Sequence, residues 1–146
     1  MKKMLLLLLI TSIFLSCKQK INQKNISNIN GYWEIERVDL PDADHKEYRM
    51  NEVFDYFAIQ NNKGYRKKVM PQLDGTFLAN DTSEKVEVVF VEDKVFLKFK
   101  TEYAIWQEEL IEISDQNMTL VSDRNIEYKY KKTAPINLLD DGNKTK

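Results

Sequence analysis

The feature that most constrains the fold is a run of short segments between Gly31 and Lys132 in which apolar and polar residues alternate. A period of two places alternate side chains on the two faces of a β-strand. Turn residues separate the segments at intervals of roughly 8–12 residues, which is typical of an antiparallel sandwich or barrel. The segments expected to be strands are residues 32–38, 53–60, 65–70, 76–79, 85–91, 95–100, 104–113, 118–121 and 126–132. The sequence therefore predicts an all-β domain, and a meander of this many strands hides its edges only by closing up.

Two regions depart from plain alternation. In the segment 104–113 the apolar phase slips between Trp106 and Ile111, which predicts a β-bulge. Residues 40–52 (LPDADHKEYRMNE) show no period, and we expect a long irregular loop there with room for one helical turn.

The start of the chain predicts export. Lys2 and Lys3 are followed by an apolar run over residues 4–15, broken only by Thr11 and Ser12. This run is shorter than the roughly 20 residues that a membrane-spanning helix needs. The pattern is typical of a secretory signal peptide, which we place at residues 1–16.

The only cysteine of the chain, Cys17, follows the signal directly. The residues Phe14-Leu15-Ser16-Cys17 resemble a bacterial lipobox, with Phe14 where Leu is usual. The resemblance implies that the signal is cut before Cys17 and that lipid is attached to the sulfur and the amine of this residue. The N-terminal lipid would then hold the protein on a membrane without a spanning helix. The alternative is an ordinary cleaved signal followed by an incidental cysteine.

The residues on either side of the predicted strands are polar. Residues 17–30 are expected to form the lipidated cysteine and a flexible tether, and residues 134–146 a polar C-terminal tail. No acidic residue follows Cys17 directly, whereas one there would resemble an inner-membrane retention signal and an acidic cluster a surface-export signal of Bacteroidetes lipoproteins. The Asn-, Lys- and Ile-rich composition resembles that phylum. We therefore expect a location in the cell envelope, on the periplasmic face of the outer membrane.

Two short motifs resemble those of the lipocalins. They are Gly31-Tyr32-Trp33, at the first strand, and Thr101-Glu102-Tyr103, between two late strands, with Glu102 where that family carries Asp. The resemblance implies a lipocalin-like, antiparallel up-and-down β-barrel of about eight to nine strands over residues 31–133, with Trp33 plugging the closed end. It also implies a cation near the end of the last strand that stacks on this tryptophan, for which Arg124 and Lys129 are candidates. Among lipocalin-like proteins, the small bacterial lipoproteins of the Bacteroidetes type fit best.

Composition excludes several function classes. A formal net charge of −1 excludes the strong basic balance of a nucleic-acid binder. One cysteine and one histidine exclude a disulfide framework and a Cys/His zinc site. His45 lies among Asp42, Asp44 and Glu47, but the spacing is not that of a metal loop, and we expect a solvated polar loop. We therefore expect no enzyme, no catalytic residue, no cofactor and no metal site.

Charged residues on two predicted strands have a defined relation to each other. Glu108 and Glu109 are adjacent, so they face opposite sides of the sheet and form no carboxylate pair. Arg66 and Lys68 share a face. A solvated strand face is the simplest interpretation of that basic run, and contact with lipid headgroups or an anionic partner is the alternative.

The function hypotheses concern the barrel interior, which in an eight-stranded barrel is either packed or holds one small ligand. The first is a binding module: a lipid-anchored barrel that takes a small hydrophobic ligand at its open end. Tyr48 and Met50 of the loop 40–52 would ring the mouth, and Phe54 and Tyr56 would continue the wall. The alternative is a packed barrel that acts as a structural or protein-interaction module and binds another envelope protein.

Overall fold

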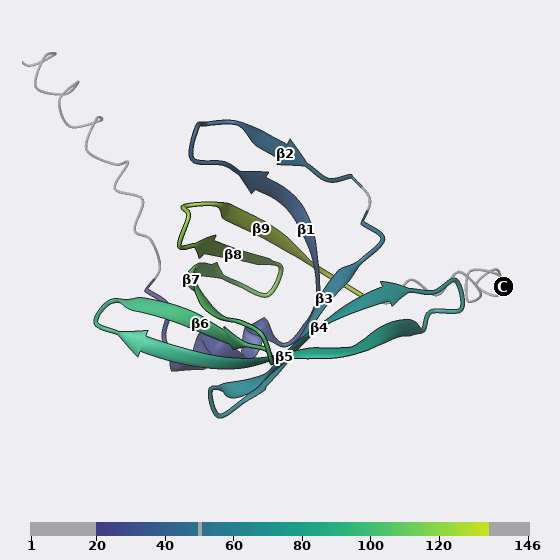
Figure 1. The fold of residues 1–146 in the computed structure, drawn as a ribbon, viewed down its shortest axis with the longest axis horizontal. Coiled ribbons are helices and arrows are strands. Elements are labelled where there is room, and N and C mark those ends of the chain that lie inside the picture. Colours follow the sequence, from purple (N-terminus) through teal and green to yellow (C-terminus); the bar gives the residue numbers. More distant parts are fainter. Residues whose placement is uncertain (1–19, 50, 135–146) are drawn as a thin grey trace, which may run out of the picture.

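The computed structural model describes residues 20–49 and 51–134. The predicted signal peptide, the lipobox with Cys17, Met50 and the chain after Ala134 lie outside the described residues. The described chain forms one antiparallel sheet that is preceded by a short 3₁₀-helix (Figure 1). None of its helical segments is long and apolar enough to span a membrane.

Eight strands close into a barrel, and one further strand extends the sheet. The sheet order is β2-β1-β3-β4-β5-β6-β7-β8-β9, and β9 pairs back onto β1. The predicted all-β antiparallel barrel is therefore confirmed, although the predicted strands 76–79 and 85–91 form one long strand, β5. The bounds are β1 (Gly31–Asp39), β2 (His45–Glu47), β3 (Phe54–Gln60), β4 (Lys63–Pro71), β5 (Phe77–Val91), β6 (Lys94–Lys100), β7 (Ile105–Ile113), β8 (Asn117–Ser122) and β9 (Glu127–Thr133).

The connections define two ends of the barrel. The β3–β4, β5–β6 and β7–β8 turns lie at the end where β1 begins, which we call the closed end. The chain between β1 and β3, the β4–β5 hairpin and the β6–β7 and β8–β9 turns lie at the other, which we call the open end. Figure 1 shows the β4–β5 hairpin extending well beyond the barrel wall.

The 3₁₀-helix η1 (Gln23–Ile29) covers the closed end. A 3₁₀-helix has three residues per turn, so Ile26 and Ile29 lie on one face, and both are buried in the core with Trp33. The Trp33 indole Nε1 donates a hydrogen bond to the Ile29 carbonyl over 2.7 Å. The flexible tether predicted for residues 17–30 is therefore wrong over η1, because two isoleucines within a polar stretch suffice to dock it. The largest fully buried side chains of the domain are Trp33, Phe57, Phe99, Ile29, Leu97, Met118 and Leu120.

The irregular loop predicted for residues 40–52 is wrong in part, because it contains β2. The backbone N–H of Leu40 donates to the Asp44 carbonyl over 2.9 Å, which turns the chain so that His45 lies opposite Asp39 of β1. Three exposed polar residues are too few to show a strand period in the sequence. The predicted bulge in residues 104–113 is confirmed, since the β7–β8 register shifts between Leu110 and Glu112.

Candidate ligand-binding site

The aromatic residues predicted to continue the ligand wall lie on the outside of the barrel. Tyr56 lies opposite Tyr32 on β1, whereas Trp33, which points inward, lies opposite Asp55. Phe54 and Tyr56 do share a face, as predicted, but it is the outer one. Their rings belong to an external aromatic cluster in which Tyr32 stacks on Phe77 at 4.1 Å between centroids. The predicted contribution of Phe54 and Tyr56 to the interior wall is therefore wrong.

Tyr48 lies in a surface groove rather than on an apolar rim. Its side chain is 42% exposed. The groove has a volume of about 450 Å³ and is otherwise charged, with a lining of Glu34, Glu36, Arg37, Glu47, Arg49, Lys129 and Lys131. Its lining suits polar rather than apolar molecules.

The interior of the barrel holds a charged cluster that the sequence did not predict. Asp55, Arg66 and Glu108 are 2%, 7% and 8% exposed. The register places Arg66 between Phe57 and Glu84, and Lys68 opposite Asp55, so these side chains share the inner face. Arg66 and Lys68 were predicted to share a face, and the pairing shows that this face is the interior. The solvated strand face proposed for them is therefore wrong for Arg66, which is buried.

Two ion pairs organise this cluster. The Arg66 guanidinium donates to the Glu84 carboxylate and lies over the Phe99 ring, 4.2 Å from its centroid. Burial lowers the pKa of Arg66, but the hydrogen bond to Glu84 and the charge of Asp55 outweigh it, so the net pKa is raised. Lys68 Nζ lies 2.6 Å from Asp55 Oδ1. Both cations therefore already have a carboxylate partner.

Glu108, on β7, is the third carboxylate of the cluster. Its Oε1 accepts a hydrogen bond from the Trp106 indole over 3.1 Å. Its Oε2 is buried and has no hydrogen-bond partner among the described residues. Burial raises the pKa of Glu108, and this outweighs the opposing effects of the Arg66 charge and the Trp106 hydrogen bond. The sequence prediction that Glu108 and Glu109 face opposite sides of the sheet already implies that one of them faces the barrel interior.

Three apolar or aromatic side chains beside the core are not fully covered. Ile35, Trp106 and Tyr128 pack against the core, yet each remains partly exposed. Trp106 stacks on Phe99 with 5.2 Å between ring centroids. Solvent therefore reaches these three side chains beside the core, whereas Trp33 and Phe57 nearer the closed end are fully buried.

The closed end carries the structural signature. Gly31 has a φ of +121°, and a Cβ there would lie 3.1 Å from Cε of Lys132. Lys132 Nζ lies 5.0 Å from the Trp33 ring centroid and donates to the Asn28 carbonyl over 2.8 Å. The cation that stacks on the tryptophan is therefore Lys132. Arg124 and Lys129, the predicted candidates, are wrong because the β1–β9 register places Lys132 opposite Trp33.

The second signature, Thr101-Glu102-Tyr103, forms the β6–β7 turn as expected. The Thr101 hydroxyl accepts hydrogen bonds from the backbone N–H groups of Tyr103 and Ala104, at 3.2 and 3.0 Å. Glu102 and Tyr103 are exposed. Thr101 thus caps the turn, and both signatures act in the fold rather than in a site.

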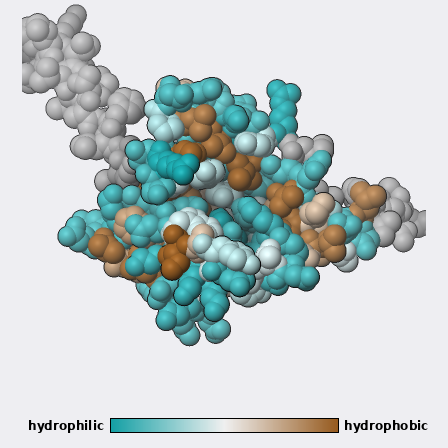
Figure 2. All heavy atoms as spheres, viewed as in Figure 1, coloured by the Kyte–Doolittle hydropathy of each residue, from teal (hydrophilic) through white to brown (hydrophobic). Residues whose placement is uncertain are grey.

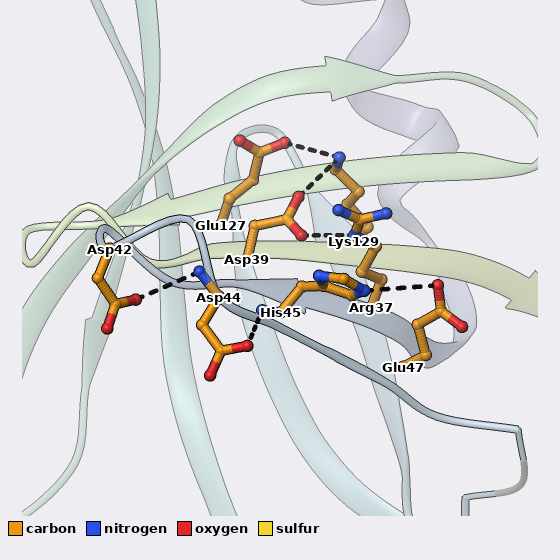
Figure 3. Close-up of polar contacts among 8 residues, drawn as sticks. All are labelled: Arg37, Asp39, Asp42, Asp44, His45, Glu47, Glu127 and Lys129. Atoms are coloured by element: carbon orange, nitrogen blue, oxygen red, sulfur yellow. Dashed lines mark hydrogen bonds and ion pairs between the residues drawn. The ribbon is translucent and has the colours of Figure 1, made fainter.

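His45 and its acidic neighbours Asp42, Asp44 and Glu47 are exposed, and Figure 3 shows the polar contacts that they make. His45 Nε2 is 4.0 Å from Glu47 Oε1, and Asp44 accepts from the His45 backbone N–H. Beside them Asp39 joins Arg37 and Lys129, at 2.5 and 2.9 Å. Across residues 20–49 and 51–134, no three His, Cys, Asp or Glu side chains are arranged to hold a metal ion.

Fold and site together define an up-and-down β-barrel that is plugged at one end and has partly exposed inward side chains toward the other. The model of the lipocalin-like domain family matches residues 29–120, and the chain belongs to this family. The predicted lipocalin-like character is therefore confirmed. No curated protein matches the chain in sequence.

Three solved structures are similar to the chain at low sequence identity. A lipocalin-like protein from Bacteroides uniformis ATCC 8492 is 11% identical with a TM-score of 0.47, covering 73% of this chain and 99% of that one. An uncharacterized protein from Bacteroides eggerthii DSM 20697 is 11% identical with a TM-score of 0.46, covering 71% and 98%. Apocrustacyanin C1 is 13% identical with a TM-score of 0.47, covering 82% and 68%.

Proposed function

We propose that the protein is a lipid-anchored protein of the cell envelope that binds a small hydrophobic ligand in the open half of its barrel. The observation that carries this proposal is the partial exposure of Ile35, Trp106 and Tyr128 beside the core. A barrel packed throughout would bury such side chains, as the closed end buries Trp33 and Phe57. Barrel mouths with apolar walls and a few polar groups are favoured ligand sites.

Exposed apolar side chains at the open end support the same proposal. Scattered exposed apolar residues are ordinary, but a concentration at one site is typical of an interaction site. A groove of about 270 Å³ on the β4–β5 hairpin is lined by Val53, Lys68, Met70, Leu78, Ala79 and Asn80. Figure 2 shows brown, apolar atoms gathered over this hairpin and a second group in the middle of the molecule. Apart from Tyr48, which lies in the charged groove, and Ile105, which faces outward from β7, the exposed large apolar residues of the open end are Val53, Met70, Leu73, Leu78 and Tyr103.

The anchor rests on the sequence at Cys17. Only five residues separate Cys17 from the first residue of η1, so this segment spans at most about 20 Å. Lys20 also forms an ion pair with Asp93 of the β5–β6 turn, at 2.5 Å. A lipid on Cys17 would therefore hold the closed end near the membrane and leave the open end facing the periplasm.

Ligand binding is tested by native mass spectrometry of the full chain, purified from its own host. We expect a small molecule that stays bound after mild extraction, together with saturable binding of a polarity-sensitive apolar dye. Trp106→Ala should weaken dye binding, and the exposed Ile105→Ala is the matched control. If the wild type retains no molecule and binds no dye, the barrel is a packed interaction module instead.

The anchor has a separate test. Cys17→Ser should move the protein from the membrane fraction to the soluble fraction, because it removes the sulfur that carries the lipid. The mature wild type should carry the mass of attached acyl chains. A variant that still fractionates with membranes, beside a wild type without lipid mass, would contradict lipidation.

A further inference from the structure

The open half of the barrel holds one more carboxylate than cations among the described inward side chains. Arg66 pairs with Glu84, and Lys68 pairs with Asp55. Glu108 remains without a cation of its own. A buried ionised group is stable only when it is paired or fully hydrogen-bonded, so an ionised Glu108 with one hydrogen bond and no cation of its own is unfavourable here.

The geometry of Glu108 leaves one oxygen available. Oε1 is occupied by the Trp106 indole, whereas Oε2 is buried and without a partner in the described part of the chain. Buried polar atoms without partners are rare in folded proteins, and they often mark a place where a ligand or ion completes the hydrogen bonding. Glu108 is also more than nine-tenths buried, so a partner must enter the barrel to reach it.

We propose that Glu108 Oε2 accepts a hydrogen bond from a protonated amine on the ligand, so that the barrel binds cationic amphiphiles. This inference rests on the proposed ligand-binding function. An ammonium group supplies a hydrogen-bond donor for Oε2 and the positive charge that balances the third carboxylate of the cluster. The apolar part of the ligand would lie against Trp106, Tyr128 and Ile35, the partly exposed residues of the open half.

The same cluster disfavours an anionic headgroup. Arg66, the buried cation, already donates to Glu84 and is covered by the rings of Phe99 and Phe57, at 4.2 and 5.8 Å. A carboxylate ligand would have to displace Glu84 and would face Glu108. Repulsion of this kind discriminates between ligands as effectively as attraction does.

The surroundings of Glu108 also favour exchange of a proton for the ligand. The groups that face it are Arg66 on β4, Asp55 on β3, Glu84 on β5 and the phenols of Tyr128 and Tyr130 on β9. Burial, with the two acidic neighbours, raises the pKa of Glu108 against the opposing effects of Arg66 and Trp106. The carboxyl therefore accepts a proton more readily in the fold than in water, and a bound ammonium would replace that proton.

The test uses three short probes that differ only in the headgroup: hexylammonium, hexan-1-ol and hexanoate. They are titrated into the full chain, purified as its host produces it, and binding is followed by the NMR signal of the Trp106 indole N–H. A charge-assisted hydrogen bond predicts that hexylammonium binds about tenfold or more tightly than hexanoate. This comparison on the wild type alone can overturn the proposal, because equal or tighter binding of hexanoate contradicts it.

The variants locate the effect. Glu108→Gln should weaken hexylammonium about tenfold and leave hexan-1-ol within about twofold. Glu109→Gln is the matched control, since Glu109 lies on the outer face and pairs with Lys94 at 2.9 Å. Undiminished hexylammonium binding by Glu108→Gln would overturn the headgroup assignment. If hexan-1-ol and hexanoate bind but hexylammonium does not, only this inference fails, whereas binding of none of the three overturns the proposed function as well.

Discussion

The two ends of the barrel bury different chemistry. At the closed end, Trp33 packs against Ile26 and Ile29 of η1, and the indole N–H is satisfied by a backbone carbonyl. In the open half, the inner face carries Arg66 and Glu108 at a similar degree of burial. The barrel thus has an apolar plug, completed by η1, at one end and an ionic cluster toward the other.

This difference indicates which end of the barrel stabilises the fold and which end is suited to binding a ligand. Burial of apolar area stabilises by roughly 25 cal/mol per Å². Buried ion pairs contribute little net stability, because the cost of desolvation offsets the Coulomb attraction. We therefore expect the closed end to contribute most of the stability of the fold. The charged groups of the open half should contribute to ligand binding rather than to stability.

The strongest contrast is between the two tryptophans. Trp33→Ala should lower the free energy of unfolding by about 3–5 kcal/mol, the usual cost of truncating a large aromatic residue in a core. Trp106→Ala should cost clearly less, because its ring is partly exposed. Urea unfolding followed by circular dichroism measures both. A Trp33 variant that loses less than about 1 kcal/mol, as a surface substitution would, would contradict the conclusion that the closed end stabilises the fold.

Two isoleucines give a second comparison, with smaller expected changes in the free energy of unfolding. Ile29→Ala should cost about 2–4 kcal/mol, because it removes a fully buried side chain through which η1 docks. Ile105→Ala, at the start of β7 and 74% exposed, should stay within about 0.5 kcal/mol of the wild type. Equal losses at the two positions would mean that η1 does not seal the barrel.

Alternation predicts every strand except β2, although it divides β5 into two, and it predicts the position of the β7 bulge, since these features depend on local period. It does not predict which way a charged face points. Arg66 and Lys68 share a face in either orientation, and only the pairing of Arg66 with Phe57 shows that this face is the interior. The rule that charges point outward therefore fails for the ionic cluster in the open half.

The docking of η1 and the role of Lys132 at the closed end were not predicted from the sequence, for a different reason. Ile26 and Ile29 stand among Asn, Ser and Lys residues, so the local composition resembles a tether although two apolar side chains suffice for docking. Lys132 was not identified as the partner of Trp33 because that pairing depends on the register between the first and last strands. Sequence spacing alone does not contain that register.

A third pair tests the seal of the closed end. Lys132→Met should cost about 1–2 kcal/mol, because it removes a cation–π contact with Trp33 and a hydrogen bond to the Asn28 carbonyl. Lys131→Met, next to it on the exposed outer face of β9, should have little effect on urea unfolding. Equal stability of Lys132→Met and the wild type would show that the apolar packing of η1 is sufficient by itself.

The smallest expected effect concerns the pH dependence of the open half. Burial raises the pKa of Glu108 above the ordinary value of 4.5, so the folded protein binds this proton more tightly than the unfolded chain does. The stability that this group contributes is therefore complete below 4.5 and is lost as the pH rises through the raised pKa.

Glu108→Gln removes this titration while keeping an oxygen for the Trp106 indole. Urea unfolding between about pH 4 and pH 8 should show the variant equal to the wild type at the acidic end and more stable at the upper end. Glu109→Gln, on the outer face, should still lose stability relative to Glu108→Gln as the pH rises, as the wild type does. A wild type that gains stability over Glu108→Gln as the pH rises would mean that Glu108 is held as a paired carboxylate. The closed and open ends would then not differ in how well their buried groups are satisfied.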